Sequence, residues 1–566
     1  MADLSLNSFQ KYLLLGFSFC LVAFGQPAWI WWFGLLASFF GYACFWRVLL
    51  TISSRLERFI TAMGWFAGVQ IVQLSWALSH PYLYMYPLLV LIAWFLGAQW
   101  GVLALWITPS SLKKTSTLFA LSGGWVLLEW SRLFVLSGFP FDPIGLALTG
   151  SIYSLQFVAI GGVYLLSYWV ALTNLFVLRT WFQNAGNIRS LSWITCLLIA
   201  LTPYGFGWLH IHQHAARQAQ STRQIETLLV QTAFPVEQKI SFASFEQARH
   251  FVLNQWKQIF ALIADQHSTS PELIVLPENL VPYGTYSLVF SFPSALEAWT
   301  GAFGLDAVKS LPALEGPFAD FVEIDKKLNW YVNNAYFCQA LANLFQAHLI
   351  IGLEDQLYLQ DLKEESYSAA LHFYPRDHKL ETYEISRYKK RILVPMGEYI
   401  PFEFCRKLAS KYGVQGSFTP GKTAKLFNGP VPLGPSICYE EAFGHLMRDN
   451  RLKGAELFVN ITNDGWYPHS KLPQQHFDHS RLRAIENGVP LVRACNTGVT
   501  GAIDSLGRIV GTWGKDSTEA QEKAGAFKVS VPTYHFSTLY TFWGDYFVLI
   551  LSITSLLFGI VLRKKS

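Results

Sequence analysis

Apolar runs about as long as a bilayer is thick constrain this chain more than any other feature. They fall near residues 11–26, 28–46, 59–79, 83–108, 116–137, 152–178, 190–212 and 542–562. A helix needs about 20 apolar residues to cross the hydrocarbon core of a membrane, with some tolerance for tilt. We therefore expect a membrane α-helical bundle of about eight spans.

The runs divide the chain into three predicted parts. Residues 1–212 form a seven-span bundle, residues 213–535 a globular domain, and residues 536–566 a final span with a basic cytoplasmic tail. Lys11 before the first run could mark a cleaved signal peptide, but no cleavage pattern of small residues follows it. We therefore interpret the first run as a retained span.

Lysine and arginine residues predict the orientation of the bundle. They occupy alternate loops between the runs, and the intervening short loops have none. The positive-inside rule makes the basic set cytoplasmic and places residues 213–535 on the opposite side. The basic set comprises Lys11, Arg47, Arg55, Arg58, Lys113, Lys114, Arg179, Arg189, Arg563, Lys564 and Lys565.

Composition excludes some classes of partner and site. The net charge is +5, but the excess lies in the short loops between spans, so we expect no nucleic-acid partner. Only 14% of residues are charged, against roughly 25% in an average soluble protein. The 7 cysteines include no C-x-x-C pair. Neither a zinc site nor a disulfide framework is indicated.

Residues 213–535 alternate short apolar strands with helical patterns. The runs 228–230, 273–276, 349–351 and 457–459 predict strands, and apolar residues at helical spacing over 245–263 predict an amphipathic helix. This order favours an α/β layered fold. About 70 residues with many aromatics separate the second strand from the third, a length typical of a lid or an inserted arm.

Three segments place a reactive side chain at the end of an apolar strand: Glu278, Lys390 and Cys438. Each has an ordinary interpretation by itself, as a loop carboxylate, a surface cation or a small buried residue. Together they could supply a base, a cation that stabilises a thiolate and an oxyanion, and a nucleophile. Spacing alone does not prove that they converge.

The segments resemble the three signatures of the nitrilase, or carbon–nitrogen hydrolase, superfamily. The whole pattern is similar to its membrane branch, the bacterial apolipoprotein N-acyltransferases, over essentially the entire chain. The matching motifs are P-E (277–278), Y-x-K-x-x-L-V-P-x-G-E-x-x-P (388–401), I-C-Y-E (437–440), N-D-G-W-Y (463–467), N-T-G-V-T (496–500) and G-F-P (138–140).

The resemblance implies a fold and a set of roles. The domain is expected to be a nitrilase-like αββα sandwich. Cys438 would be the nucleophile, Glu278 the general base and Lys390 the stabiliser of thiolate and oxyanion. The supporting residues would be Glu398 as a second carboxylate, Tyr439 and Glu440 along the pocket, with the Tyr439 N–H in the oxyanion hole, and Trp466 as a lid aromatic against acyl chains. Ordinary packing is the alternative for Trp466.

The resemblance also implies a reaction. Cys438 would take an acyl chain from a phospholipid and pass it to the α-amine of a diacylglyceryl-cysteine at an apolipoprotein N-terminus, without a cofactor. The location would be the bacterial inner membrane, with the domain on the periplasmic side. The alternatives are a membrane-tethered amidase for small amides, which has no need of eight spans, and a non-catalytic transporter or receptor, which has no need of all three reactive residues.

Some positions depart from the family pattern or remain open. Ile240 stands where relatives often carry a lid Trp, and Asn279 gives P-E-N in place of P-E-T. Cys495 beside N-T-G-V-T is expected to be a packing residue. Glu129 and Arg132 share one helical face in the fifth run, where an ion pair that holds the bundle and a phospholipid headgroup contact are equally open.

The orientation can be tested with reporter fusions. A reporter at Gln218 and one at Ser566 should lie on opposite sides of the membrane, because one span separates the domain from the C-terminus. Activity of a side-specific reporter in each fusion is the measurement. Reporters on the same side would contradict the eight-span topology.

Overall fold

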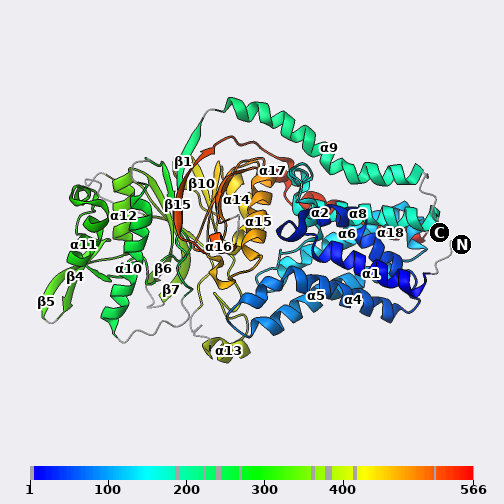
Figure 1. Cartoon of the computed structure of the whole chain (residues 1–566), viewed down its shortest axis with the longest axis horizontal. Coiled ribbons are helices and arrows are strands. Elements are labelled where there is room, and N and C mark those ends of the chain that lie inside the picture. The colour runs from blue at the N-terminus through cyan, green and yellow to red at the C-terminus, as the bar shows by residue number, and fades with distance from the viewer. Residues whose placement is uncertain are drawn as a thin grey trace. The chain divides into compact units, whose positions relative to one another are not determined.

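The computed structural model divides the chain into two compact units (Figure 1). The helical unit comprises Met1–Gln220, Ser470–Gly488 and Phe536–Ser566, and the sheet unit comprises Ser221–His469 and Val489–His535. The structure describes residues 6–184, 191–221, 223–236, 244–266, 270–324, 326–358, 364–376, 385–411, 417–514 and 518–564.

One helix differs from the predicted contiguous domain at 213–535. Helix α15 (Leu472–Asn487) belongs to the helical unit. Its polar side chains bond to the backbone of that unit: Gln475 Nε2 donates to the Gln73 carbonyl at 3.0 Å, and Glu486 Oε1 accepts from the Val163 N–H at 3.1 Å. The sequence did not predict this because many of the buried residues of the helix are polar, among them Gln475, Asp478 and Glu486.

The helical unit is built from apolar helices with short connections. Pro27 begins α2, where its missing N–H costs nothing, and this produces the predicted break after α1. The helices are α1 (Ser8–Ala23), α2 (Pro27–Leu36), α3 (Tyr42–Leu49), α4 (Arg55–Gln73), α5 (Met85–Trp106), α6 (Thr115–Ser131), α7 (Ile152–Leu155), α8 (Val158–Asn184), α9 (Leu191–Gln220), α15, α17 (Leu539–Trp543) and α18 (Tyr546–Lys564).

Length and hydropathy mark membrane spans among these helices. Within the described residues, four stretches are long and apolar enough to cross a membrane: Pro27–Leu49, Met85–Trp106, Val158–Gln183 and Leu191–Gln220. Ser8–Ala23 and Tyr546–Val561 are apolar but shorter. The predicted spans at 59–79 and 116–137 correspond to α4, which begins with charged residues, and α6, which has 17 residues. The unit is a membrane domain, and the total of eight spans stays a prediction.

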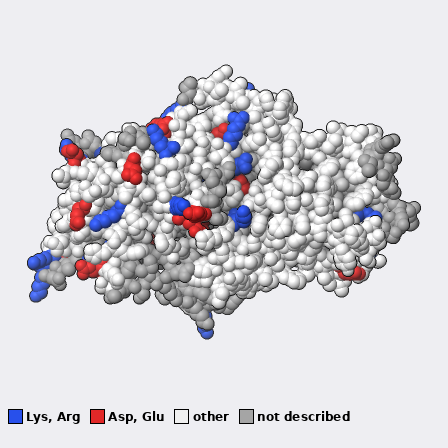
Figure 2. All heavy atoms as spheres, viewed as in Figure 1, with Lys and Arg blue, Asp and Glu red and all other residues white. Residues whose placement is uncertain are grey.

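Surface composition separates the two units. On the face shown in Figure 2, charged side chains gather on the sheet unit, and the surface of the helical unit is almost free of them. Large apolar side chains of the helical unit are exposed instead, among them Leu91, Leu198 and Ile550 at 67%, 64% and 63%. Such a surface suits lipid rather than water.

Small residues let helices of the bundle approach closely. A Cβ added at Gly123 of α6 would lie 2.6 Å from the carbonyl oxygen of Ser552 on α18, so only glycine fits there. Small residues at helix contacts are typical of membrane bundles, where packing replaces the hydrophobic effect as the driving force.

Glu129 and Arg132 are both buried within this unit, each 2% exposed. Glu129 Oε1 accepts from Trp125 Nε1 and from the Ile144 N–H, both at 2.8 Å, and Arg132 Nε donates to Gln99 Oε1 at 2.8 Å. Each charge therefore has its own polar neighbours, and these contacts link α5, α6 and the segment that follows α6.

The sheet unit holds two six-stranded sheets and a small third one. The orders are β15-β1-β2-β6-β7-β8, β14-β13-β12-β11-β10-β9 and β3-β5-β4. Strands β1, β2 and β6 are parallel, as are β10, β11 and β12, with Leu433 opposite Leu457. The first sheet has β1 (Gln224–Gln231), β2 (Leu273–Val275), β6 (His348–Tyr358), β7 (Glu364–Phe373), β8 (Ser386–Lys389) and β15 (Gly525–Pro532). The second has β9 (Phe427–Asn428), β10 (Pro432–Ile437), β11 (Leu457–Thr462), β12 (Leu491–Cys495), β13 (Thr500–Ile503) and β14 (Ile509–Trp513).

Two apolar cores confirm the layered α/β fold. One core lies between the two large sheets and combines Leu229 and Ile350 of the first with Ile437 and Val459 of the second. The other lies between the first sheet and the helices α10 (Phe245–Ala264) and α12 (Asn334–Phe345). The predicted strands and the predicted amphipathic helix are all found in these layers. Further helices of the unit are α13 (Arg406–Lys411), α14 (Gly444–Leu452) and α16 (Thr518–Gln521).

The long aromatic segment between β2 and β6 is an inserted arm. It forms β3 (Phe290–Ser291), α11 (Phe292–Phe303), β4 (Ala319–Ile324) and β5 (Lys327–Val332) before α12 begins. Its side chains Phe290, Trp299 and Phe318 are buried in the same core as α10 and α12. Most of its aromatic residues therefore serve packing.

A buried histidine pair in the first sheet generates a pH prediction. His348 Nδ1 lies 3.0 Å from His372 Nε2, and His372 stacks on Phe427. Burial lowers the pKa of both imidazoles, that of His372 to about 3. An unfolded chain binds the proton near pH 6.5. The stability contributed by neutral His372 is therefore full above about pH 6.5 and is lost as the pH falls from there toward about 3, by about 1.4 kcal/mol per pH unit.

The prediction is that His372→Gln reduces this loss. The thermal midpoint of the detergent-solubilised wild type should fall between pH 7 and pH 5.5 by more than that of the variant. The control is His250→Gln, whose side chain is 70% exposed and which should follow the wild type. Equal pH dependence of His372→Gln and wild type would contradict a neutral buried pair.

Candidate functional site

The three reactive residues predicted from sequence meet at the ends of strands from both large sheets. Glu278 follows β2, Lys390 follows β8, and Cys438 follows β10. Lys390 Nζ donates to Glu278 Oε1 at 2.9 Å, and the charges of both act on the Cys438 thiol. The strand ends thus bring together residues that lie 48 to 160 positions apart in the chain.

Lys390 is the centre of this site. Its side chain is 1% exposed, and Nζ also donates to Glu398 Oε1 at 2.6 Å. The second oxygen of Glu398 accepts from the Val394 N–H at 2.9 Å. Burial alone lowers the pKa of Lys390, but the contacts with Glu278 and Glu398 hold it well above its ordinary value. The cation therefore persists in the interior at neutral pH.

Lys389, the neighbouring cation, lies elsewhere. Its Nζ is 3.5 Å from the centre of the Tyr367 ring, and burial lowers its pKa. Consecutive residues of a strand point to opposite faces. The geometry thus favours Lys390 over Lys389 as the site cation.

The turn that carries Glu278 needs two special residues. A Cβ added at Gly352 would lie 2.5 Å from the Glu278 Cα, so glycine allows β6 to pass closely beneath the turn. The Gly352 N–H donates to the Pro277 carbonyl at 2.9 Å. Asn279 has φ of +41°, a region that asparagine tolerates better than a β-branched residue. This explains why Asn279 fits in the P-E-N variant of the motif.

Cys438 lies on a sharp strand-to-helix turn. It follows β10 directly and begins the 3₁₀ segment Cys438–Ala442, with φ of +51°. Non-glycine residues in this left-handed region are strained and often mark functional sites. The side chain is only partly buried, whereas Cys338 and Cys495 are fully buried. Cys438 is thus both strained and accessible.

The resting thiol is protonated. Burial of its surroundings raises the pKa of Cys438, and the Glu278 charge raises it further. Lys390 lowers it but does not compensate, and Asp464 adds another increase. A nucleophilic thiolate would thus require a base in the same site, and Glu278 is a carboxylate whose charge acts on the thiol.

Glu440 is buried and connects the segment of Cys438 to the segment of Lys390, and it does not line an open pocket. It is 0% exposed. Its Oε2 accepts from the Ile437 N–H at 2.8 Å and from the Tyr388 hydroxyl at 2.9 Å, and its Oε1 accepts from the N–H groups of Arg391 and Ile392. These bonds join the turn before Cys438 to the segment after Lys390.

Tyr439 and Trp466 are partly exposed near this turn. Tyr439 packs edge-on against Phe443 with ring centres 5.0 Å apart. Trp466 ends the 3₁₀ segment Asp464–Trp466, where the Asn463 side chain accepts from the Gly465 N–H at 3.1 Å. Ile240, where relatives often have Trp, lies outside the described residues.

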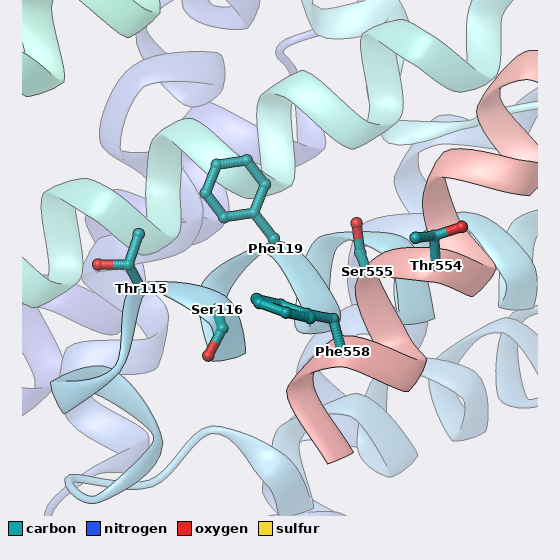
Figure 3. A pocket seen from close by; sticks show the side chains of 6 residues that line it. All are labelled: Thr115, Ser116, Phe119, Thr554, Ser555 and Phe558. Atoms are coloured by element: carbon teal, nitrogen blue, oxygen red, sulfur yellow. The ribbon is translucent and has the colours of Figure 1, made fainter. Parts of the chain in front are cut away.

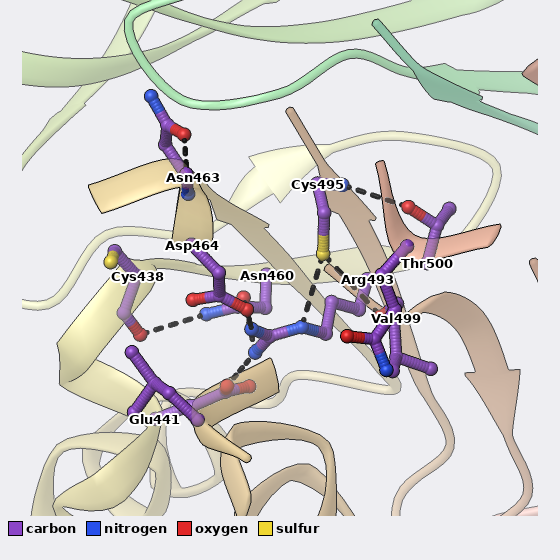
Figure 4. A network of polar contacts seen from close by, with 12 residues as sticks. Cys438, Glu441, Asn460, Asn463, Asp464, Arg493, Cys495, Val499 and Thr500 are labelled. Carbon is purple, nitrogen blue, oxygen red and sulfur yellow. Dashed lines mark hydrogen bonds and ion pairs between the residues drawn. The ribbon is translucent and has the colours of Figure 1, made fainter. Parts of the chain in front are cut away.

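A polar network beneath Cys438 was not predicted from sequence (Figure 4). Arg493 of β12 is 0% exposed and contacts Glu441, Asn460, Asp464 and Cys495. One signal was available, because Arg493 is a lone charge in an apolar strand and a buried charge needs partners. Cys495 is buried in this network, where its Sγ accepts from Arg493 Nε at 3.3 Å and donates to the Val499 carbonyl at 3.4 Å.

A groove in the helical unit holds no comparable chemistry (Figure 3). It lies between α6 and α18, and its lining has aromatic and hydroxyl side chains but no ionisable group. The lining residues are Thr115, Ser116, Phe119, Thr554, Ser555 and Phe558. Within the described residues, no cluster of three or more His, Cys, Asp or Glu side chains could hold a metal ion.

Comparisons with known proteins match both units. The carbon-nitrogen hydrolase family matches residues 244–532, and the family of the apolipoprotein N-acyltransferase N-terminal domain matches residues 18–176. The apolipoprotein N-acyltransferase of Chlamydia pneumoniae is 32% identical over 94% of this chain and 93% of its own length. That of Chlamydia caviae is 31% identical, over 95% of each chain.

Solved structures give a weaker likeness. An amidase of the nitrilase superfamily from Nesterenkonia is 17% identical with a TM-score of 0.30, and covers 54% of this chain and 90% of that one. This likeness carries no argument about chemistry.

The position of Lys390 generates a prediction about thiol reactivity. Lys390→Met should slow alkylation of Cys438 by about tenfold or more, because the cation lowers the thiol pKa and its loss leaves carboxylates that raise it. The measurement is the rate of iodoacetamide labelling at pH 8, read by peptide mass spectrometry. Lys389→Met is the matched control and should label like the wild type. A slow Lys389 variant beside a normal Lys390 variant would reverse the assignment.

Proposed function

Since the chain belongs to the apolipoprotein N-acyltransferase family, we propose that it transfers an acyl chain from a phospholipid to the N-terminal amine of a diacylglyceryl-cysteine in apolipoproteins. The observation that carries this proposal is the match of both parts, the membrane region 18–176 and the region 244–532. The chain is an acyltransferase of the carbon–nitrogen hydrolase superfamily, and the Glu278-Lys390-Cys438 triad is the proposed catalytic set.

In the first step Cys438 takes the acyl chain. Glu278 accepts the thiol proton, and the thiolate attacks the ester carbonyl of the phospholipid. Lys390 and the Tyr439 backbone N–H stabilise the oxyanion that forms. The tetrahedral intermediate expels the glycerol oxygen, which takes the proton from Glu278. The products are a thioester on Cys438 and a lysophospholipid.

In the second step the acceptor amine attacks the thioester. Glu278 accepts a proton from the amine as the new carbon–nitrogen bond forms, and the carbon–sulfur bond breaks. The leaving thiolate takes that proton back, which restores the resting thiol. Amines attack thioesters readily, so exclusion of water directs the intermediate to transfer rather than hydrolysis. No cofactor takes part in this scheme.

The other residues have supporting roles in this proposal. Glu398 holds Lys390 in place through the 2.6 Å contact, and Glu440 holds the segments of Lys390 and Cys438 together. Trp466 is proposed to contact acyl chains, since it is partly exposed in the N-D-G-W-Y segment. Tyr439 contributes its backbone to the oxyanion hole.

The location follows from the substrates and from the charge pattern. Both proposed substrates are anchored in a membrane, so a membrane domain raises their local concentration at the site. We place the protein in the bacterial inner membrane, with the sheet unit on the periplasmic side, because lysine and arginine residues mark the other side as cytoplasmic.

Two other functions are less well supported. An amidase that acts on small amides would need the region 244–532 but not the matched membrane region. A transporter or receptor would not need a buried lysine held by two carboxylates beside an accessible cysteine. Neither alternative explains both parts of the chain.

The proposal predicts an acyl-enzyme on Cys438. Incubation of the purified protein with phospholipid alone should add one acyl chain, and hydroxylamine should release it because the bond is a thioester. A lipopeptide with a free N-terminal amine, added afterwards, should remove the acyl chain from Cys438. The lysophospholipid should already have been released before the lipopeptide is added. The measurement is intact mass spectrometry followed by peptide mapping.

Cysteine variants make the test specific. Cys438→Ala should load no acyl chain while the fold is intact, as judged by its thermal midpoint. Cys405→Ala is the matched control, since Cys405 is also partly exposed, and it should load normally. An adduct on another cysteine, or normal transfer by Cys438→Ala, would overturn the mechanism.

A further inference from the structure

We propose that Arg493 is the positioning residue of the nucleophile: it fixes the strained turn of Cys438 through Asn460 and Glu441, and it neutralises Asp464 beside the thiol. This inference rests on the proposed function of Cys438. Arg493 itself has no contact with the thiol, so its effect would act through these three neighbours.

The first step of the argument is that Arg493 joins separate segments. It lies at the centre of β12 and is 0% exposed. Its Nη1 pairs with Glu441, three residues after Cys438, and donates to Asn460 Oδ1 on β11 at 3.2 Å. Its Nη2 donates to Asp464 Oδ2 at 3.0 Å (Figure 4). The guanidinium can contact Glu441, Asn460 and Asp464 at the same time because its N–H donors point in several fixed directions.

The second step concerns the orientation of Asn460. A guanidinium can only donate hydrogen bonds, so Asn460 must turn its oxygen toward Arg493. Its amide nitrogen then faces the nucleophile turn, where it donates to Ser436 Oγ at 3.0 Å and to the Cys438 carbonyl at 3.4 Å. Arg493 thereby determines which hydrogen-bonding group is presented to the backbone of Cys438.

The third step concerns strain. Cys438 has φ of +51°, and such a residue costs about 1–3 kcal/mol unless its surroundings hold it. Asn460 holds the carbonyl of Cys438, and Glu441, which lies within the following 3₁₀ segment, is held by its ion pair with Arg493. Both depend on Arg493, so removal of the guanidinium frees the turn on two sides.

The fourth step concerns charge. Glu441 and Asp464 are both buried, 0% and 3% exposed, and Arg493 lies between them. Asp464 already raises the pKa of the Cys438 thiol. A carboxylate without its counter-ion in such an interior would act more strongly on the thiol. Arg493 thus limits the negative field at the nucleophile.

The test uses three variants of the full-length protein in detergent: Arg493→Met, Arg493→Lys and the double variant Arg493→Met/Asp464→Asn. One readout is the rate of acyl loading on Cys438 from dioleoyl phosphatidylethanolamine in mixed micelles. The other is the pH profile of iodoacetamide labelling of Cys438, resolved by peptide mass spectrometry.

Arg493→Met should raise the apparent pKa of labelling and slow loading by about tenfold or more, a size typical of lost supporting contacts. In the double variant the pH profile of labelling should return toward that of the wild type, because the uncompensated charge of Asp464 is removed. Acyl loading should stay slow in this variant. A role in packing alone would not respond to the removal of a charge. An Arg493→Met profile and loading rate equal to the wild type would overturn the inference, as would a double variant whose profile stays shifted.

The control is Arg387→Met, which breaks a partly buried ion pair with Asp355 in the other sheet, at 3.0 Å. It should lower the thermal midpoint and leave the labelling profile of Cys438 unchanged. If Arg493→Met does not fold, Arg493→Lys decides the question. Lysine keeps the charge but lacks the fork, so loading should still be about tenfold slower, and normal loading would overturn the inference.

The outcomes separate this inference from the proposed function. A wild type that loads no acyl chain on Cys438 would contradict the proposed function, and the labelling profiles would still decide the role of Arg493. A wild type that loads, beside an Arg493→Met variant that loads and labels equally well, would contradict only the role of Arg493.

Discussion

The buried ammonium of Lys390 is the interaction on which the candidate site depends. A charge with 1% exposure is costly in a protein interior unless it is paired and hydrogen-bonded. Here Glu278 and Glu398 supply that pairing at 2.9 and 2.6 Å. The same contacts tie the end of β2 to the segment after β8. The same ion cluster therefore connects the segments of the site and holds Lys390, the cation that would stabilise an oxyanion.

Burial and the charges around the thiol together explain why it stays protonated at rest. Burial raises the pKa of Cys438 most, Glu278 and Asp464 raise it further, and the lowering by Lys390 does not compensate. In the proposed mechanism the nucleophile forms only when Glu278 takes the proton, which couples deprotonation to attack on a carbonyl. A thiol that is inert until substrate arrives suits an enzyme surrounded by lipid, because it does not react with other electrophiles in the meantime.

Much of this arrangement was predictable from sequence. Apolar runs predicted the helices, and the strand-end motifs predicted Glu278, Lys390 and Cys438 because they resemble the signatures of a known family. Helix α15 groups with the helical unit, which the sequence did not predict because many of its buried residues are polar and hydropathy cannot reveal polar burial. Arg493 and Asn460 were missed because their partners lie in other segments, and contacts across strands have no local pattern. Glu440 was expected along the pocket, but four hydrogen bonds hold it as a clamp.

Backbone strain links these findings. Asn279, Met396 and Cys438 all have positive φ, at +41°, +65° and +51°, and each adjoins or belongs to the site. A strained backbone conformation persists only where several contacts from the surrounding structure hold it. Gly352 and the Pro277 carbonyl do so at Glu278, and Asn460, Glu440 and Glu441 do so around Cys438. The polar groups buried beneath the site thus replace a simpler apolar core because they hold backbone shapes that apolar packing alone would not maintain.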